Sequence, residues 1–81
     1  MRRDIVSIRD VIAANEMLKE RGSALRVHMH DACGGQSFSL RGDAGERATD
    51  AERQAVLDLM RSLGHAMEFG RDGVNFWVVR A

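Results

Sequence analysis

The sequence has 81 residues, 44% of them hydrophobic, and its 12 Lys and Arg balance its 12 Asp and Glu. A core this small cannot be divided, so residues 1–81 are expected to form a single domain. The two charge signs are interspersed, which argues against a nucleic-acid partner and against a polybasic contact with a membrane. No apolar run has the length of a membrane span, no signal-peptide pattern is present, and a lone cysteine is typical of a reducing compartment. We therefore expect a cytoplasmic protein.

The first predicted element is a helix. Ser7 and Asp10 are spaced as in a capping box, and apolar residues then recur at helical spacing, which predicts a helix over residues 8–21. The preceding Ile5 and Val6 fit either an additional helical turn or a short edge strand.

A hairpin is expected next. Residues 24–30 alternate between apolar and polar side chains, which is typical of a strand with one wet face. The turn signal Asp31-Ala-Cys-Gly-Gly follows, and the alternation resumes over residues 36–41.

The second half of the sequence repeats this order. Thr49 and Glu52 form another capping box, before a helix that we expect to end at Gly64. Residues 66–69 then lead to a turn at Arg71-Asp-Gly and to a last strand over residues 74–78.

The two halves, about residues 5–41 and 49–80, align as internal copies. An offset of about 42 residues pairs Gly22 with Gly64, and a shorter offset pairs Phe38 with Phe76. Neither unit can bury its apolar face alone. We therefore expect an α+β two-layer sandwich of αββαββ order, in which two helices cover one face of a four-stranded, mainly antiparallel sheet.

The other face of that sheet is expected to be open and to carry the single tryptophan of the sequence. Strand alternation sends one set of residues toward the helices, namely Leu25, Val27, Met29, Phe38, Leu40, Met67, Phe69, Val74, Phe76 and Val78. It sends a second, mostly polar set outward, namely Arg26, His28, His30, Ser37, Ser39, Glu68, Asn75, Trp77 and Val79. Trp77 is either covered by an arginine stem or a chain end, or it marks an interface with a partner or a second copy.

The segment from His28 to Gln36 is chemically the most suggestive. The second hairpin turns on three residues, whereas the first uses five, so we expect the longer turn to have a function. The candidate binding residues are His28, His30, Asp31, Cys33, Gly34, Gly35, Gln36 and Trp77. The pattern H-x-H-x-x-C makes His28, His30 and Cys33 candidate ligands of zinc or iron, with Asp31 or His65 as a fourth. The competing interpretation is two solvated histidines on an open sheet face.

Cys33 is also a candidate reactive thiol. The N–H groups of Gly34 and Gly35 can stabilise a thiolate, and a protonated His28 or His30 would lower the pKa of the thiol. The competing interpretation is a small hydrophobic side chain under an ordinary turn. A hydrolytic triad is poorly supported, because its members would be crowded into one loop, so the sequence leans away from an enzyme.

The stretch His30-Asp-Ala-Cys-Gly-Gly-Gln-Ser resembles the motif of the RDAC family of small bacterial proteins, with His30 in place of the arginine. The resemblance covers nearly the whole chain and implies no activity. Residues 63–80 are similar to the last hairpin of TusA-type sulfur carriers, whose C-P-x-P element is replaced here by Ser7-Ile-Arg-Asp. Residues 24–27 and 33–38 are similar to the first cysteine region of A-type iron–sulfur carriers, whose closing C-G-C pair is absent.

Three functional hypotheses follow. The first is a small cytoplasmic accessory or binding module that uses the loop over residues 30–37. The second is a thiol- or metal-handling protein in sulfur, selenium or iron traffic, in which Cys33 acts with His28 and His30. The third is a homodimeric interaction domain that uses the open sheet face around Trp77. A homodimer through an edge strand is a further expectation.

Overall fold

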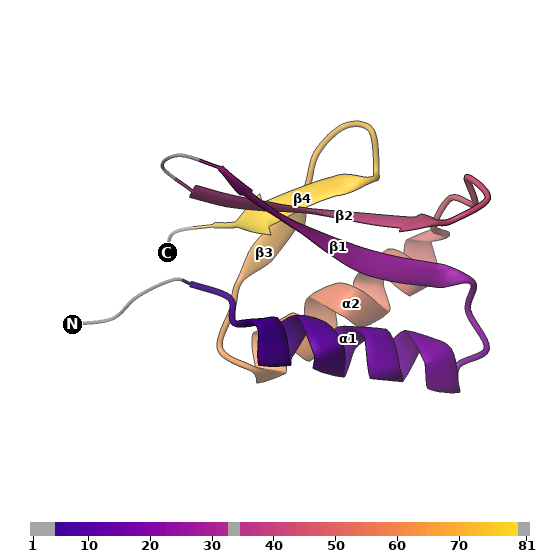
Figure 1. The fold of residues 1–81 in the computed structure, drawn as a ribbon, viewed down its shortest axis with the longest axis horizontal. Coiled ribbons are helices and arrows are strands. Elements are labelled where there is room, and N and C mark those ends of the chain that lie inside the picture. The colour runs from indigo at the N-terminus through magenta and orange to yellow at the C-terminus, as the bar shows by residue number, and fades with distance from the viewer. Residues whose placement is uncertain (1–4, 33–34, 80–81) are drawn as a thin grey trace.

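A computed structural model describes residues 5–32 and 35–79. Its elements, in chain order, are α1 (Ile8–Glu20), β1 (Leu25–Ala32), β2 (Gly35–Gly42), α2 (Asp50–Ser62), β3 (Met67–Phe69) and β4 (Asn75–Val78). The strands form one antiparallel sheet in the order β1-β2-β4-β3. Both helices lie against the same face of this sheet (Figure 1). The predicted α+β sandwich of αββαββ order is thereby confirmed.

The core lies between the two helices and the inner face of the sheet. Of the residues predicted to point inward, five are buried, namely Leu25, Val27, Phe38, Leu40 and Phe76. Met29, Met67, Phe69 and Val78 are partly buried against them, and Val74 is half-buried just before β4. Phe38 and Phe76, the aligned residues of the two units, are register partners whose ring centroids lie 5.5 Å apart. Equivalent positions of the two units therefore meet at the centre of the sheet.

The segment before α1 is held by a side chain and has no regular structure of its own. Residues 5–7 form neither a helical turn nor a strand, so both readings of Ile5 and Val6 are wrong. The Val6 N–H donates to Oε1 of Gln36 at 3.0 Å, and the Val6 carbonyl accepts from Nε2 of Gln36 at 3.0 Å. The amide of Gln36 thus supplies both hydrogen bonds that a neighbouring strand would have supplied, and Val6 is buried.

Both helices end in the same way. Gly22 and Gly64 follow the two C-caps with positive φ of 75° and 96°, a conformation that glycine adopts without a steric penalty. The N–H groups of Ser23 and His65 then donate to carbonyls five residues earlier, at 3.0 and 2.8 Å, which completes a Schellman motif at each end. The aligned glycines therefore have one shared role, which is to turn the chain from a helix toward a strand.

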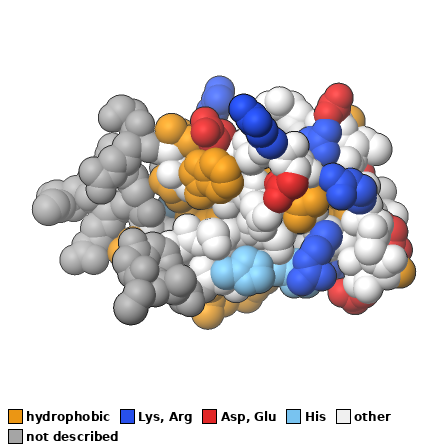
Figure 2. Space-filling view, turned by 90° about the horizontal axis from the view of Figure 1, so that it is seen from above, with side chains coloured by type: hydrophobic (Ala, Val, Ile, Leu, Met, Phe, Trp, Pro, Cys, Tyr) orange, Lys and Arg blue, Asp and Glu red, His pale blue; other side chains and the backbone are white. Residues whose placement is uncertain are grey.

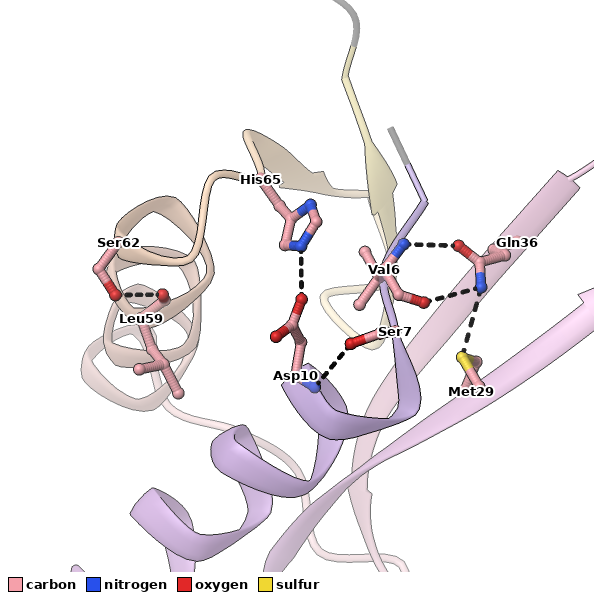
Figure 3. A network of polar contacts seen from close by, with 8 residues as sticks. All are labelled: Val6, Ser7, Asp10, Met29, Gln36, Leu59, Ser62 and His65. Carbon is pink, nitrogen blue, oxygen red and sulfur yellow. Dashed lines mark hydrogen bonds and ion pairs between the residues drawn. The ribbon is translucent and has the colours of Figure 1, made fainter. Parts of the chain in front are cut away.

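The residue after each of these glycines contacts the first turn of the opposite helix. Ser23 Oγ donates to Oε2 of Glu52 at 2.9 Å, and His65 Nε2 lies 2.7 Å from Oδ2 of Asp10 (Figure 3). Asp10 and Glu52 occupy the same position of their helices, three residues after the N-caps. A carboxylate in this position stabilises the positive end of its own helix dipole. Here each carboxylate also contacts the residue that follows the end of the other helix. The two helices are therefore connected at both ends.

The Asp10–His65 pair is expected to stabilise the fold measurably. Its side chains are only 20% and 10% exposed, so Asp10→Asn and His65→Gln should each lower the free energy of unfolding by about 1–3 kcal/mol. The double variant should lose little more than either single variant, because both remove the same contact. Urea unfolding measures all four proteins, and Asp58→Asn, at an exposed side chain of α2, is the control. Strictly additive losses would contradict the pairing.

Glu52 should make the stability depend on pH. The Thr49 N–H donates to its carboxylate at 2.9 Å, and chiefly this bond holds the pKa of Glu52 below its ordinary value of 4.5. A lowered folded-state pKa stabilises the protein above the unfolded-state pKa, and this stabilisation is lost as the pH falls through the folded-state pKa. Glu52→Gln should therefore melt below the wild type at pH 7, and the gap should close below about pH 4.5. The pKa of Asp72 is also lowered, by the N–H groups of Val74 and Asn75. Asp72 is present in both proteins, so its contribution cancels when their melting temperatures are compared. If the melting temperatures of the two proteins keep the same difference down to about pH 3, this role of Glu52 is excluded.

Candidate functional site

The sheet face that points away from the helices, called the outer face below, collects most of the predicted site residues. Strand alternation places on it Arg26, His28 and His30 of β1, Ser37, Ser39 and Arg41 of β2, Asn75 and Trp77 of β4, and Glu68 of β3. Figure 2 looks onto this face and shows histidine, basic, acidic and hydrophobic side chains on it. The predicted division between inward and outward residues is therefore correct along all four strands.

Ser39 is the buried centre of this face. It lies opposite His28 on β1 and opposite Asn75 on β4, and it is only 3% exposed. Its Oγ lies 3.1 Å from Nε2 of His30, an exposed residue. Nε2 of His28 is also enclosed, and it has no hydrogen-bond partner among residues 5–32 and 35–79. The two histidines therefore differ: His30 is exposed, whereas His28 is half-buried and its Nε2 is enclosed.

Trp77 lies against a glycine. A Cβ atom added to Gly70 would come within 2.9 Å of the indole ring of Trp77, so the absence of a side chain at this position makes room for the ring. The Gly70 N–H donates to the Asn75 carbonyl at 2.8 Å, which extends the pairing of β3 with β4 beneath the ring. Trp77 nevertheless stays 38% exposed. The backbone of Gly70 therefore supports the indole ring from one side.

Gln36 lies on the other side of the sheet from the two histidines. Besides its two bonds to Val6, its Nε2 lies 3.5 Å from Sδ of Met29, which points inward (Figure 3). The side-chain amide of Gln36 thus makes its contacts within the fold. Of the predicted binding residues, Gln36 has a structural role that its place in the sequence motif did not indicate.

His65 does not join the other histidines either. It lies in the helix layer with Asp10, so it is not a fourth ligand beside His28 and His30. Within the residues that the structure describes, no three His, Cys, Asp or Glu side chains are grouped to hold a metal ion.

The tip of the first hairpin completes the predicted set. Cys33 and Gly34 lie outside the described residues, as does the side chain of Asp31, while Gly35 opens β2 opposite Ala32. The three-ligand set of His28, His30 and Cys33 therefore stays a prediction.

Comparisons with known proteins add no relative: no family model matches the chain, and neither a curated protein nor a solved structure matches it. Neither of the two helices in the described ranges is long and apolar enough to cross a membrane.

Proposed function

We propose that the protein is a non-catalytic binding module that contacts a protein partner through its outer face. The observation that carries the proposal is Trp77, which is held against Gly70 and stays 38% exposed on a helix-free face. Exposed aromatic rings with a fixed orientation contribute much of the binding energy at protein interfaces, because they bury a large area and lose little entropy.

The polar residues around Trp77 support the same proposal. His30, Ser37 and Asn75 are exposed beside it and offer donors and acceptors that a partner can pair with. Nε2 of His28 is enclosed without a partner in the described residues, and such a nitrogen gains a hydrogen bond if a bound partner shifts the ring. An aromatic anchor bordered by such groups matches the anatomy of a protein interface.

Trp77→Ala tests this proposal directly. The tagged wild-type protein should capture a partner from a lysate of its source cells, and the purified partner is then titrated. We expect Trp77→Ala to weaken binding by about 30-fold or more. Leu63→Ala, a change at an equally exposed apolar residue at the end of α2, should leave binding within about twofold.

The fluorescence of Trp77 supplies an independent readout, because the sequence has one tryptophan. It should shift when the partner binds, since the ring leaves water. Equal binding by Trp77→Ala and Leu63→Ala, or binding without a fluorescence change, would show that the partner uses another surface.

A second proposal keeps Cys33 as a thiol or metal ligand that acts with His28 and His30. The observation that favours it is that the two histidines share the outer face of β1, two residues apart, and that β1 leads directly to Cys33. Zinc should then raise the melting temperature, because a ligand that binds only the folded state stabilises it by about 2.7 kcal/mol at a hundredfold excess over Kd. Cys33→Ser and His30→Ala should abolish the increase, while Ser37→Ala should retain it. No increase in the wild type, or an unchanged increase in Cys33→Ser, would remove this proposal.

A further inference from the structure

The strand β1 forms one edge of the sheet, and its outer backbone groups can be identified from the pairing of β2. The Leu40 N–H donates to the Val74 carbonyl at 2.9 Å, so it points away from β1. Val27, the register partner of Leu40, therefore points its own N–H and carbonyl away from β2, toward the free edge. By the same alternation, Met29 and Asp31 also present their backbone groups to this edge.

The first half of the edge is closed by side chains. Asn15 of α1 accepts from the Val27 N–H at 2.7 Å and donates to the Val27 carbonyl at 3.2 Å. The Leu25 N–H donates to Ser23 Oγ at 3.1 Å, and Arg26 donates to the Leu25 carbonyl. The backbone groups of Leu25 and Val27 are thereby unable to pair with a further strand, which is a common way to protect an exposed edge.

The second half of the edge has no such closure among residues 5–32 and 35–79. No side chain of the described residues hydrogen-bonds the N–H or the carbonyl of Met29. Asp31, two residues further along β1, directs its backbone groups the same way. The edge thus offers two consecutive positions at which an added antiparallel strand can pair.

An exposed apolar stripe of α1 lies toward the same end of the molecule as this half of the edge. Ile8 and Ile12 lie on the same side of the helix as Asn15, about two turns and one turn before it, and are 63% and 53% exposed. Because α1 and β1 run in opposite directions (Figure 1), moving from Asn15 to Ile8 corresponds to moving from Val27 toward His30. Arg9 and Glu16, which are exposed neighbours of Ile12 on the helix surface, border this stripe. Two large apolar side chains are therefore exposed on the half of α1 that lies beyond the Asn15–Val27 contact in the direction of the unprotected half of β1.

We infer that a second copy of this chain pairs with the open half of β1 in an antiparallel, two-fold arrangement. Met29 of each copy then pairs with Asp31 of the other, and all four edge groups are satisfied. This register places His30 opposite its own counterpart, in a position without ladder hydrogen bonds, where Cβ atoms lie about 4.5–5.5 Å apart. A register centred on Met29 is disfavoured, because it would place Asp31 against Val27, whose groups are already bound by Asn15.

A second copy fits this surface for two reasons. A two-fold axis brings the isoleucine stripes of both copies together below the paired strands, and each copy covers the same apolar residues in the other. The chain has a net charge of zero, so two copies do not repel each other as a whole. The inference does not depend on the outer-face proposal, although pairing in this way would join the two outer faces into one continuous surface.

Sedimentation equilibrium tests the interface. The wild type should sediment as a dimer, and Ile12→Lys should weaken the dimer by about tenfold or more without lowering the melting temperature, because Ile12 is exposed. Leu63→Lys, just after α2, the helix that packs against β3, and Trp77→Ala, on the outer face, should leave the dimer intact. If Trp77→Ala loses the dimer and Ile12→Lys keeps it, the contact lies on the outer face and the inference is overturned. A wild type that is monomeric at about 1 mM, a concentration at which weak contacts form, would overturn it too.

Disulfide formation tests the register. In a Cys33→Ser background, His30→Cys should cross-link to its counterpart rapidly under mild oxidation. His28→Cys should cross-link at least about tenfold more slowly. In this register the two copies of residue 28 are offset by four residues along the strand, which separates them by about 14 Å. Equal rates, or a faster reaction of His28→Cys, would show that the two copies do not pair through Met29 and Asp31.

Discussion

The two contacts between a helix start and the opposite helix end set the geometry on which the rest of the molecule depends. Asp10 holds His65 and Glu52 holds Ser23, so each helix begins where the other one ends. Since each hairpin leaves its helix at one of these tied ends, the two hairpins reach the sheet from opposite directions. The carboxylates have a double use, because each also stabilises the first turn of its own helix. A mainly antiparallel sheet above an antiparallel helix pair follows from this arrangement.

The same symmetry determines which strands are central and which form edges. β2 and β4 meet at Phe38 and Phe76, and β1 and β3 are left outside. The two units then differ where function is proposed. β1 has eight residues and β3 has three, so the first unit supplies the long edge, while the second supplies Trp77 and its glycine. Both proposed contact surfaces lie at points where the two units are not equivalent.

The sequence predicts the fold well because its local signals agree. Capping residues, helix-ending glycines and strict strand alternation each favour the observed elements, and the repeat implies that equivalent residues meet. Three features of the structure could not be predicted from the sequence. The clamp of Gln36 on Val6 depends on two segments that lie 30 residues apart. Asn15 looks like an ordinary polar helix residue until β1 is placed beside it, and Gly70 looks like part of a turn until Trp77 is placed over it. Long-range placement decides all three, and no local pattern encodes it.

Only some of the predicted binding residues come together in the structure, for the same reason. Alternation brings His28, His30 and Trp77 to one face, as expected, but it says nothing about the packing that encloses Nε2 of His28 and Ser39. The expectation that the first hairpin has the longer turn is wrong: β1 runs to Ala32 and β2 begins at Gly35, whereas residues 70–74 connect β3 to β4. Asp31 and Gly35 belong to the strands, because their backbones continue the pairing of β1 with β2. Gln36, in the same segment, serves the fold.

The most direct test of the outer face as the contact surface is amide and indole chemical-shift mapping of the isotope-labelled protein with its captured partner. We predict that the largest shifts fall on the Trp77 indole, Ser39 and Asn75, with α1 and α2 little changed. Shifts centred on the two helices, with the Trp77 indole unchanged, would contradict the account.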